Sequence, residues 1–172
     1  MGSDGLVVDV SNEPGLLERL YRAHVPRNVR IGYLLVGDVE VARELVHDAF
    51  LRTSFRLHTL RDSDAFGAYL TRSVINASKR HRERRERERR YVATEAAQPT
   101  SHAVQPDIAG RDELLRAMRE LPHRQRAALV LRYYADLSEA EIAEVLGGAV
   151  GTVRSLISRG LATLRRRMGE EE

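Results

Sequence analysis

The sequence of 172 residues contains no cysteine, no tryptophan and only one lysine, Lys79. The absence of cysteine excludes a disulfide-stabilised scaffold, a zinc finger with thiolate ligands and catalysis by a cysteine nucleophile. No apolar run approaches the roughly 20 residues needed to cross a bilayer. Because the first residues also lack the basic and apolar segments of a secretory signal, we expect a soluble, cytoplasmic protein.

Basic and acidic residues are nearly equal in number, but the basic residues are almost all of one type. Lysine and arginine together number 28 against 25 acidic residues, and every basic residue except Lys79 is arginine. A GC-rich genome is one explanation of this bias, and the bidentate contacts of arginine with phosphate and guanine are another. Aromatic residues make up 5% of the chain, which favours helices built from leucine, valine and alanine over a β-sandwich.

Hydrophobic periodicity predicts an all-α fold. Apolar residues recur at helical spacing, with Pro26 interrupting or bending the first helix, and no segment alternates as a strand does. Residues 91–109 hold two prolines and no sustained period, which is typical of a flexible linker between two small helical domains. The predicted parts are a disordered N-terminus (1–13), a first domain (14–90), the linker (91–109), a second domain (110–168) and an acidic tail (169–172).

Two helices of the second domain form a predicted helix-turn-helix. Ser138 and Glu141 have the spacing of a capping box, and Gly147-Gly148 ends the helix that they begin. Residues 149–168 then carry a net charge of +5, as expected of a helix that lies in a major groove. The alternative is that late arginines complement the helix dipole, which leaves Arg154 at the positive end unexplained. The side chains expected to face the bases are Thr152, Arg154, Ser155, Ser158 and Arg159.

A second concentration of positive charge spans residues 79–90. It contains eight basic and three acidic residues, a net charge of +5. One interpretation is a solvated helix with Arg–Glu pairs three and four residues apart. Since three carboxylates cannot neutralise eight cations, the excess favours contacts with phosphate groups.

At this point the sequence resembles a known family. Residues 121–146, LPHRQRAALVLRYYADLSEAEIAEVL, and residues 151–155, GTVRS, resemble the promoter −35-binding domain of an extracytoplasmic-function (ECF) sigma factor. In the first domain, Asp38 with residues 42–51 resembles the helix that binds the polymerase clamp, and residues 65–76 with the basic run resemble the −10 segment. The resemblance covers residues 14–168 and implies sigma region 2 in the first domain and sigma region 4 in the second.

The resemblance also implies which residues make contact. Those facing core polymerase are Leu45, His47, Asp48, Phe50 and Arg52. Those at the −10 DNA are Phe66, Tyr69, Asn76, Lys79, Arg80, Arg82 and Arg84. Leu45, Phe50, Phe66 and Tyr69 have an alternative role in the core of the domain, because each is apolar enough to be buried.

Three positions depart from the family pattern. Phe66 stands where tryptophan is usual, Leu156 where an arginine is common, and Ala149 where a serine often caps the recognition helix. The loss of that cap costs about 1 kcal/mol. We expect these departures to change promoter strength and the preferred −35 sequence and to leave the role of the domain intact.

The sequence therefore predicts a sigma factor that directs RNA polymerase to specific promoters and helps to open the DNA. The alternative, a helix-turn-helix regulator that never joins the polymerase, leaves the first domain unexplained. We expect no enzyme, cofactor or metal, because HExxH and GxxxxGK[ST] motifs are absent and the six histidines lack metal-ligand spacing. The expected partners are polymerase core, through the clamp of its largest subunit, promoter DNA and an anti-sigma protein of the kind that the family often uses, without membrane insertion.

Overall fold

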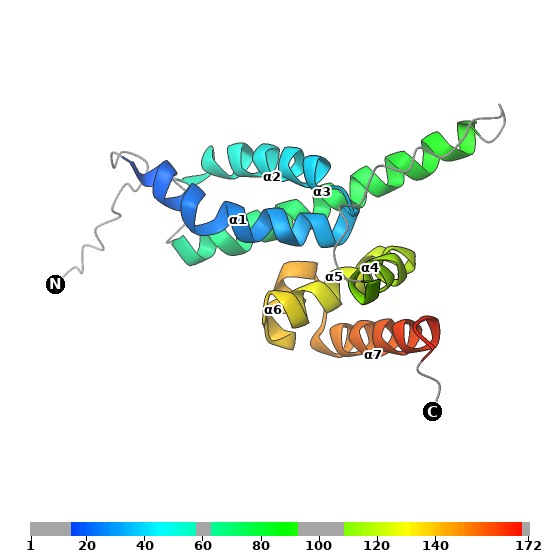
Figure 1. Ribbon diagram of the computed structural model, residues 1–172. Coiled ribbons are helices and arrows are strands. Elements are labelled where there is room, and N and C mark those ends of the chain that lie inside the picture. The colour runs from blue at the N-terminus through cyan, green and yellow to red at the C-terminus, as the bar shows by residue number, and fades with distance from the viewer. Residues whose placement is uncertain (1–14, 58–62, 93–108, 170–172) are drawn as a thin grey trace.

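The computed structural model describes residues 15–57, 63–92 and 109–169. Within these ranges the regular elements are seven α-helices and one π-helical turn, so the all-α prediction is confirmed. The predicted N-terminal segment, residues 93–108 of the predicted linker and the last three residues of the acidic tail lie outside the described residues. Figure 1 shows two helical units, the first made from the N-terminal half of the chain and the second packed beneath it.

The first unit contains three long helices, α1 (Leu16–Val36), α2 (Val39–Ser54) and α3 (Ser63–Val92). Gly37 allows the sharp turn between α1 and α2 because its φ of +80° is left-handed, and the Asp38 carboxylate then caps α2 by accepting from two backbone N–H groups. Pro26 lies inside α1, which continues through it as one helix. The buried core of this unit consists of Leu20, Val25, Val46, Ala49, Phe50, Leu57, Phe66, Leu70 and Val74.

The second unit begins with α4 (Ala109–Glu120) and α5 (His123–Leu129). The sequence predicts one helix over residues 123–134, but after Leu129 the chain widens into a π-helical turn, η3 (Val130–Tyr134). The N–H of Ala135 donates to the carbonyl of Val130 across 3.0 Å, five residues back, and this wide turn ends the helix.

The predicted helix-turn-helix consists of α6 (Glu139–Leu146) and α7 (Val150–Arg167). The capping box is present, with Ser138 Oγ accepting from the N–H of Glu141 and the Glu141 carboxylate accepting from the N–H of Ser138. Gly147 ends α6 with a φ of +63°. Ala149 stands at the N-cap of α7 without a side-chain hydrogen bond, as its apolar side chain predicts.

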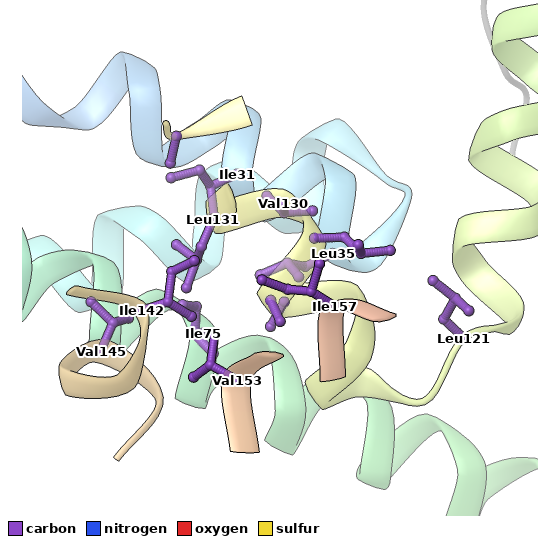
Figure 2. Close-up of a cluster of buried hydrophobic side chains, with 14 of the residues drawn as sticks. Ile31, Leu35, Ile75, Leu121, Val130, Leu131, Ile142, Val145, Val153 and Ile157 are labelled. Atoms are coloured by element: carbon purple, nitrogen blue, oxygen red, sulfur yellow. The ribbon is translucent and has the colours of Figure 1, made fainter. Parts of the chain in front are cut away.

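The two units share a hydrophobic core, which their separation by a linker does not predict. Ile31 and Leu35 of α1 and Ile75 of α3 are each at most 4% exposed and belong to the same cluster as the buried side chains of the second unit. Figure 2 shows these three side chains converging with others that include Leu131 and Ile142. The first unit therefore provides part of the surface that covers the core of the second.

Candidate nucleic-acid and polymerase interfaces

The outward face of α7 presents the residues predicted to contact bases. Thr152, Arg154, Ser158 and Arg159 are exposed, and Ser155 is half-buried with its hydroxyl donating to the carbonyl of Gly151 at 3.0 Å. The opposite face buries Val153, Ile157 and Leu164 against the other helices of the unit. The structure thus brings all five predicted residues together on the solvent side of one helix, next to its N-terminus.

Arg154 has a partner that the sequence did not reveal. Its guanidinium donates to the carboxylate of Glu139 in α6, with Nη2 at 2.8 Å and Nε at 3.2 Å from Oε2. The hydrogen bond and the charge of Glu139 raise the pKa of Arg154 above its ordinary value. In contrast, no side chain of the described ranges pairs with Arg159. Arg159 is therefore an exposed cation near the start of the recognition helix that no carboxylate of the described ranges pairs.

The basic run forms the second half of α3, which projects beyond both units (Figure 1). Its three glutamates form ion pairs four residues apart, Lys79–Glu83 at 3.7 Å, Arg84–Glu88 at 3.7 Å and Glu86–Arg90 at 3.4 Å. The interpretation as a solvated, ion-paired helix thus holds for these residues. Asn76 and Arg80 are exposed one turn apart, and neither has a side-chain partner in the described part of the chain.

Phe66 lies in the core of the first unit and not on its surface. It is 0% exposed, and its ring lies 5.6 Å from that of Phe50 and 5.8 Å from that of His24, centroid to centroid. Tyr69 is half-buried, with the guanidinium of Arg56 5.7 Å from the centre of its ring. In this arrangement Phe66 has the core role that the sequence left open, while Tyr69 still reaches the surface.

The residues predicted to face polymerase divide along α2 in the same way. His47, Asp48 and Arg52 are exposed, Leu45 is half-buried and Phe50 is only 6% exposed. Phe50 packs edge-on against Tyr21, with ring centroids 5.2 Å apart. Phe50 thus has the core role that the sequence left open, and the three polar residues form the accessible part of the predicted set.

The set predicted to face polymerase lacks two exposed apolar residues of this region. Leu51 is 44% exposed and Phe55, which follows the end of α2, is 80% exposed. Both follow His47 at four-residue intervals, so all three lie along one side of the helix. The signal was available, since Leu51 lies outside the apolar stripe of Ala42, Val46, Ala49 and Phe50 that this helix buries.

Polar contacts between the two units involve several basic side chains. Arg82 Nη1 donates to the carbonyl of Leu121 at 2.8 Å, and Arg119 Nη2 donates to the carbonyl of Gly37 at 3.0 Å. Three further arginines donate to carbonyls across the junction: Arg27 to Ala135, Arg72 to Glu144 and Arg126 to Leu35. Arg82, predicted to contact −10 DNA, is therefore engaged at the junction between the units.

His123 also lies at this junction. Its Nε2 is 2.8 Å from the hydroxyl of Ser78 in α3. Ser78 Oγ also lies 2.8 Å from the carbonyl of Ile75, and when its hydroxyl donates to that carbonyl, the Nε2–H of neutral His123 donates to Oγ. Burial, followed by the nearby charges of Arg126, Arg82 and Lys79, lowers the pKa of His123 to about 4. The imidazole is therefore neutral at physiological pH.

Two classes of site are not found in the described ranges. No group of three or more histidine or acidic side chains there is arranged to hold a metal ion. No described helix is both long and apolar enough to span a membrane.

Comparison with known proteins places both units in one family. Residues 20–88 match the family model of sigma-70 region 2, and residues 111–164 match that of sigma-70 region 4. The RNA polymerase sigma-E factor of Streptomyces coelicolor is 34% identical over 150 residues, which make up 86% of this chain and 83% of that protein. The ECF RNA polymerase sigma factor SigM of Mycobacterium tuberculosis is 30% identical over 164 residues, 95% of this chain and 83% of that protein.

Two solved structures have a similar fold. The sigma factor RpoE of Bartonella quintana, in complex with the anti-sigma factor NepR, matches with a TM-score of 0.73 at 20% identity, over 92% of this chain and 99% of that one. CnrH, in complex with the cytosolic domain of CnrY, matches with a TM-score of 0.67 at 21% identity, over 95% of this chain and 94% of that one. Because both units match in order, a helix-turn-helix regulator without a polymerase-binding domain is not favoured. The chain belongs to the extracytoplasmic-function family of RNA polymerase sigma factors.

Proposed function

We propose that this sigma factor reads the −35 element with the outward face of α7. The observation that carries this proposal is that Thr152, Arg154, Ser158 and Arg159 are exposed, with Ser155 half-buried beside them, on a helix that presents no acidic side chain in the described ranges. A guanidinium in the major groove donates two hydrogen bonds to guanine O6 and N7, worth roughly 1–3 kcal/mol of discrimination. Arg159 can make such a contact without losing a side-chain partner. Arg154 must first break its hydrogen bonds with the Glu139 carboxylate.

In this proposal the first unit binds the −10 element. Asn76 and Arg80, exposed one turn apart on α3, are placed to contact a separated strand, with Tyr69 nearer the N-terminus of the same helix as a stacking face. Lys79 and Arg84 add charge for phosphate contacts. Arg82 joins this set only when it releases the carbonyl of Leu121, so promoter binding and separation of the two units are coupled in this proposal.

The polymerase-facing surface lies on α2. His47, Asp48 and Arg52 surround the exposed Leu51, and Phe55 extends the apolar part of this surface past the end of the helix. Protein interfaces commonly combine a few apolar anchors with a polar rim. Leu45, half-buried next to this surface, belongs to its edge, while Phe50 supports it from the core.

The protein acts by binding and carries out no chemical step of its own in this proposal. It acts in the cytoplasm, where polymerase and promoter DNA meet. An anti-sigma protein is a further partner in this proposal, since the sigma factor RpoE of Bartonella quintana, a neighbour in fold, is described in complex with the anti-sigma factor NepR.

The −35 proposal is tested by transcription from a mapped promoter with reconstituted holoenzyme. Arg159→Ala should reduce −35-dependent transcription by roughly tenfold, equivalent to about 1.4 kcal/mol of lost contact. Arg166→Ala removes the same charge from the exposed last turn of α7 and is the matched control, with a change of no more than about twofold. Equal losses in both variants, or a parallel loss of core affinity, would contradict base reading by Arg159.

The polymerase proposal has its own test. Leu51→Ser and Phe55→Ser should weaken binding of core polymerase, measured by fluorescence anisotropy, while the urea midpoint changes little because both side chains are exposed. Val39→Ser is the matched control, because Val39 is 43% exposed at the opposite end of α2. If Val39→Ser weakens binding as much as Phe55→Ser, the contact surface is elsewhere on the helix.

A further inference from the structure

A cleft of about 340 Å³ lies at the junction of the two units. Its walls come from the end of α1, the start of α2, the second half of α3, and α4 with α5. Five arginines line it: Arg82, Arg85 and Arg89 of α3, Arg119 of α4 and Arg126 of α5. Two carboxylates, Asp38 and Glu86, face them.

Neither carboxylate forms an ion pair with an arginine of the cleft. Asp38 Oδ1 accepts from the backbone N–H groups of Glu40 and Val41, at 2.9 Å and 3.1 Å, as the cap of α2. Glu86 pairs with Arg90, which lies outside the cleft. No ion pair within 4.0 Å joins any of the five arginines to a carboxylate in the described ranges.

Some N–H donors of the cleft arginines have no acceptor in the described ranges, and Arg126 is the clearest case. It is 3% exposed, and its guanidinium donates to the carbonyls of Leu35, Arg119 and Leu121. Even so, its Nε has no hydrogen-bond partner among the described residues, and neither has Nε of Arg119. A buried donor without a partner destabilises the fold, and more so when the group is charged.

The field in the cleft is positive. Burial, followed by the charges of Arg82 and Arg119, lowers the pKa of Arg126 to about 10. Burial, then Arg84 and Arg85, lowers the pKa of His81, which also lines the cleft. An anion held there would offset the mutual repulsion of these cations.

We propose that this cleft is a binding site for a compact polyphosphate, either a free inorganic chain or the phosphate chain of a nucleotide. Its volume lies at the lower end of the range typical of small-molecule sites. Arginine forks from both units would share the oxygens, so the anion would stabilise the packed arrangement of the two units. This inference is independent of which promoter elements the protein reads.

The test is titration calorimetry of the full chain with sodium tripolyphosphate. An ionic strength of about 0.15 M screens exposed charges over roughly 8 Å. Arg85→Gln and Arg119→Gln change one cleft arginine from each unit, and each should weaken binding by roughly tenfold, about 1.4 kcal/mol. Arg87→Gln and Arg116→Gln remove the same charge from exposed positions of the same two helices outside the cleft, and each should change the affinity by less than about twofold.

The outcomes separate the proposal from its rivals. Equal weakening by all four substitutions would mean that an arginine-rich surface attracts polyanions without a site, and would overturn the proposal. Should Arg119→Gln fail to fold, the comparison of Arg85→Gln with Arg87→Gln on one helix still decides. A second titration with ATP distinguishes the sources, because tighter binding than tripolyphosphate, still lost in Arg85→Gln, identifies a nucleotide site. If the cleft substitutions weaken binding of a single-stranded oligonucleotide and leave tripolyphosphate unaffected, the cleft binds DNA and the proposal fails.

Discussion

His123 makes the packing of the two units sensitive to acid. Its folded pKa is about 4 because it is buried beside Arg126, Arg82 and Lys79, whereas an unfolded histidine titrates near 6.5. As the pH falls below 6.5, the unfolded chain binds a proton that the folded chain excludes. The free energy of unfolding therefore falls between pH 6.5 and about 4, and the contribution of His123 is fully present only above this range.

The size of the effect follows from the two pKa values. Between pH 8 and pH 5 the proton linkage of His123 should lower the free energy of unfolding by about 2 kcal/mol. The full difference, reached below pH 4, is roughly 3 kcal/mol, since one pKa unit corresponds to about 1.4 kcal/mol. Carboxylates begin to titrate near the lower end of this range, so the effect must be measured as a difference between variants.

The variant that isolates the proton linkage of His123 is His123→Gln. Glutamine cannot be protonated in this range, and its amide can donate to Ser78 Oγ as Nε2 of His123 does across 2.8 Å. Urea unfolding followed by circular dichroism at pH 8, 6 and 5 should show a shallower loss in His123→Gln than in the wild type. His47→Gln, the same change at an exposed site on α2, is the matched control. Parallel pH profiles of the wild type and His123→Gln would refute a depressed pKa at this position.

Three stability predictions concern single side chains and are checked by urea unfolding at neutral pH. Ser138→Ala removes the acceptor of the Glu141 N–H and should cost about 1 kcal/mol, so an unchanged midpoint would mean that the capping box adds nothing. Ala149→Ser supplies the missing cap of α7 and should stabilise by up to about 1 kcal/mol; a loss would show that serine cannot adopt the N-cap geometry here. Phe66→Ala, at a fully buried site, should cost about 3–5 kcal/mol, whereas Phe55→Ala at the surface should cost little, and similar costs for the two would contradict their burial.

Local spacing was sufficient to predict much of this fold. The capping box at Ser138 and Glu141 and the glycine stop at Gly147 lie within ten residues of each other, and both are present as expected. The burial of Phe50 and Phe66 could not be decided from sequence, because an aromatic residue on an apolar stripe suits either a core or a binding surface. The pairing of Arg154 with Glu139 depends on how α6 and α7 cross, which periodicity does not specify.

The packing of the two units escaped prediction for a different physical reason. The polar contacts between the two units join arginine side chains to backbone carbonyls at or just beyond the C-terminal ends of helices. The carbonyls belong to Leu35 and Gly37 for α1, Leu121 for α4, Ala135 for η3 and Glu144 for α6. These carbonyls lack intrahelical donors and carry the partial negative charge of the helix dipole, so a guanidinium satisfies them without a carboxylate.

This mode of contact gives the arginine bias a structural use besides nucleic-acid binding. Every residue type has the same backbone carbonyl, so nothing in the sequence marks the acceptor. The pattern of oppositely charged side chains does not reveal these arginine contacts either. Arginine suits the task better than lysine, because its planar fork reaches two carbonyls at once, as Arg126 does at Leu35 and Leu121. Carbonyls accept hydrogen bonds from these cations but do not cancel their full charge. The same contacts that pack the two units therefore leave the positive cleft between them.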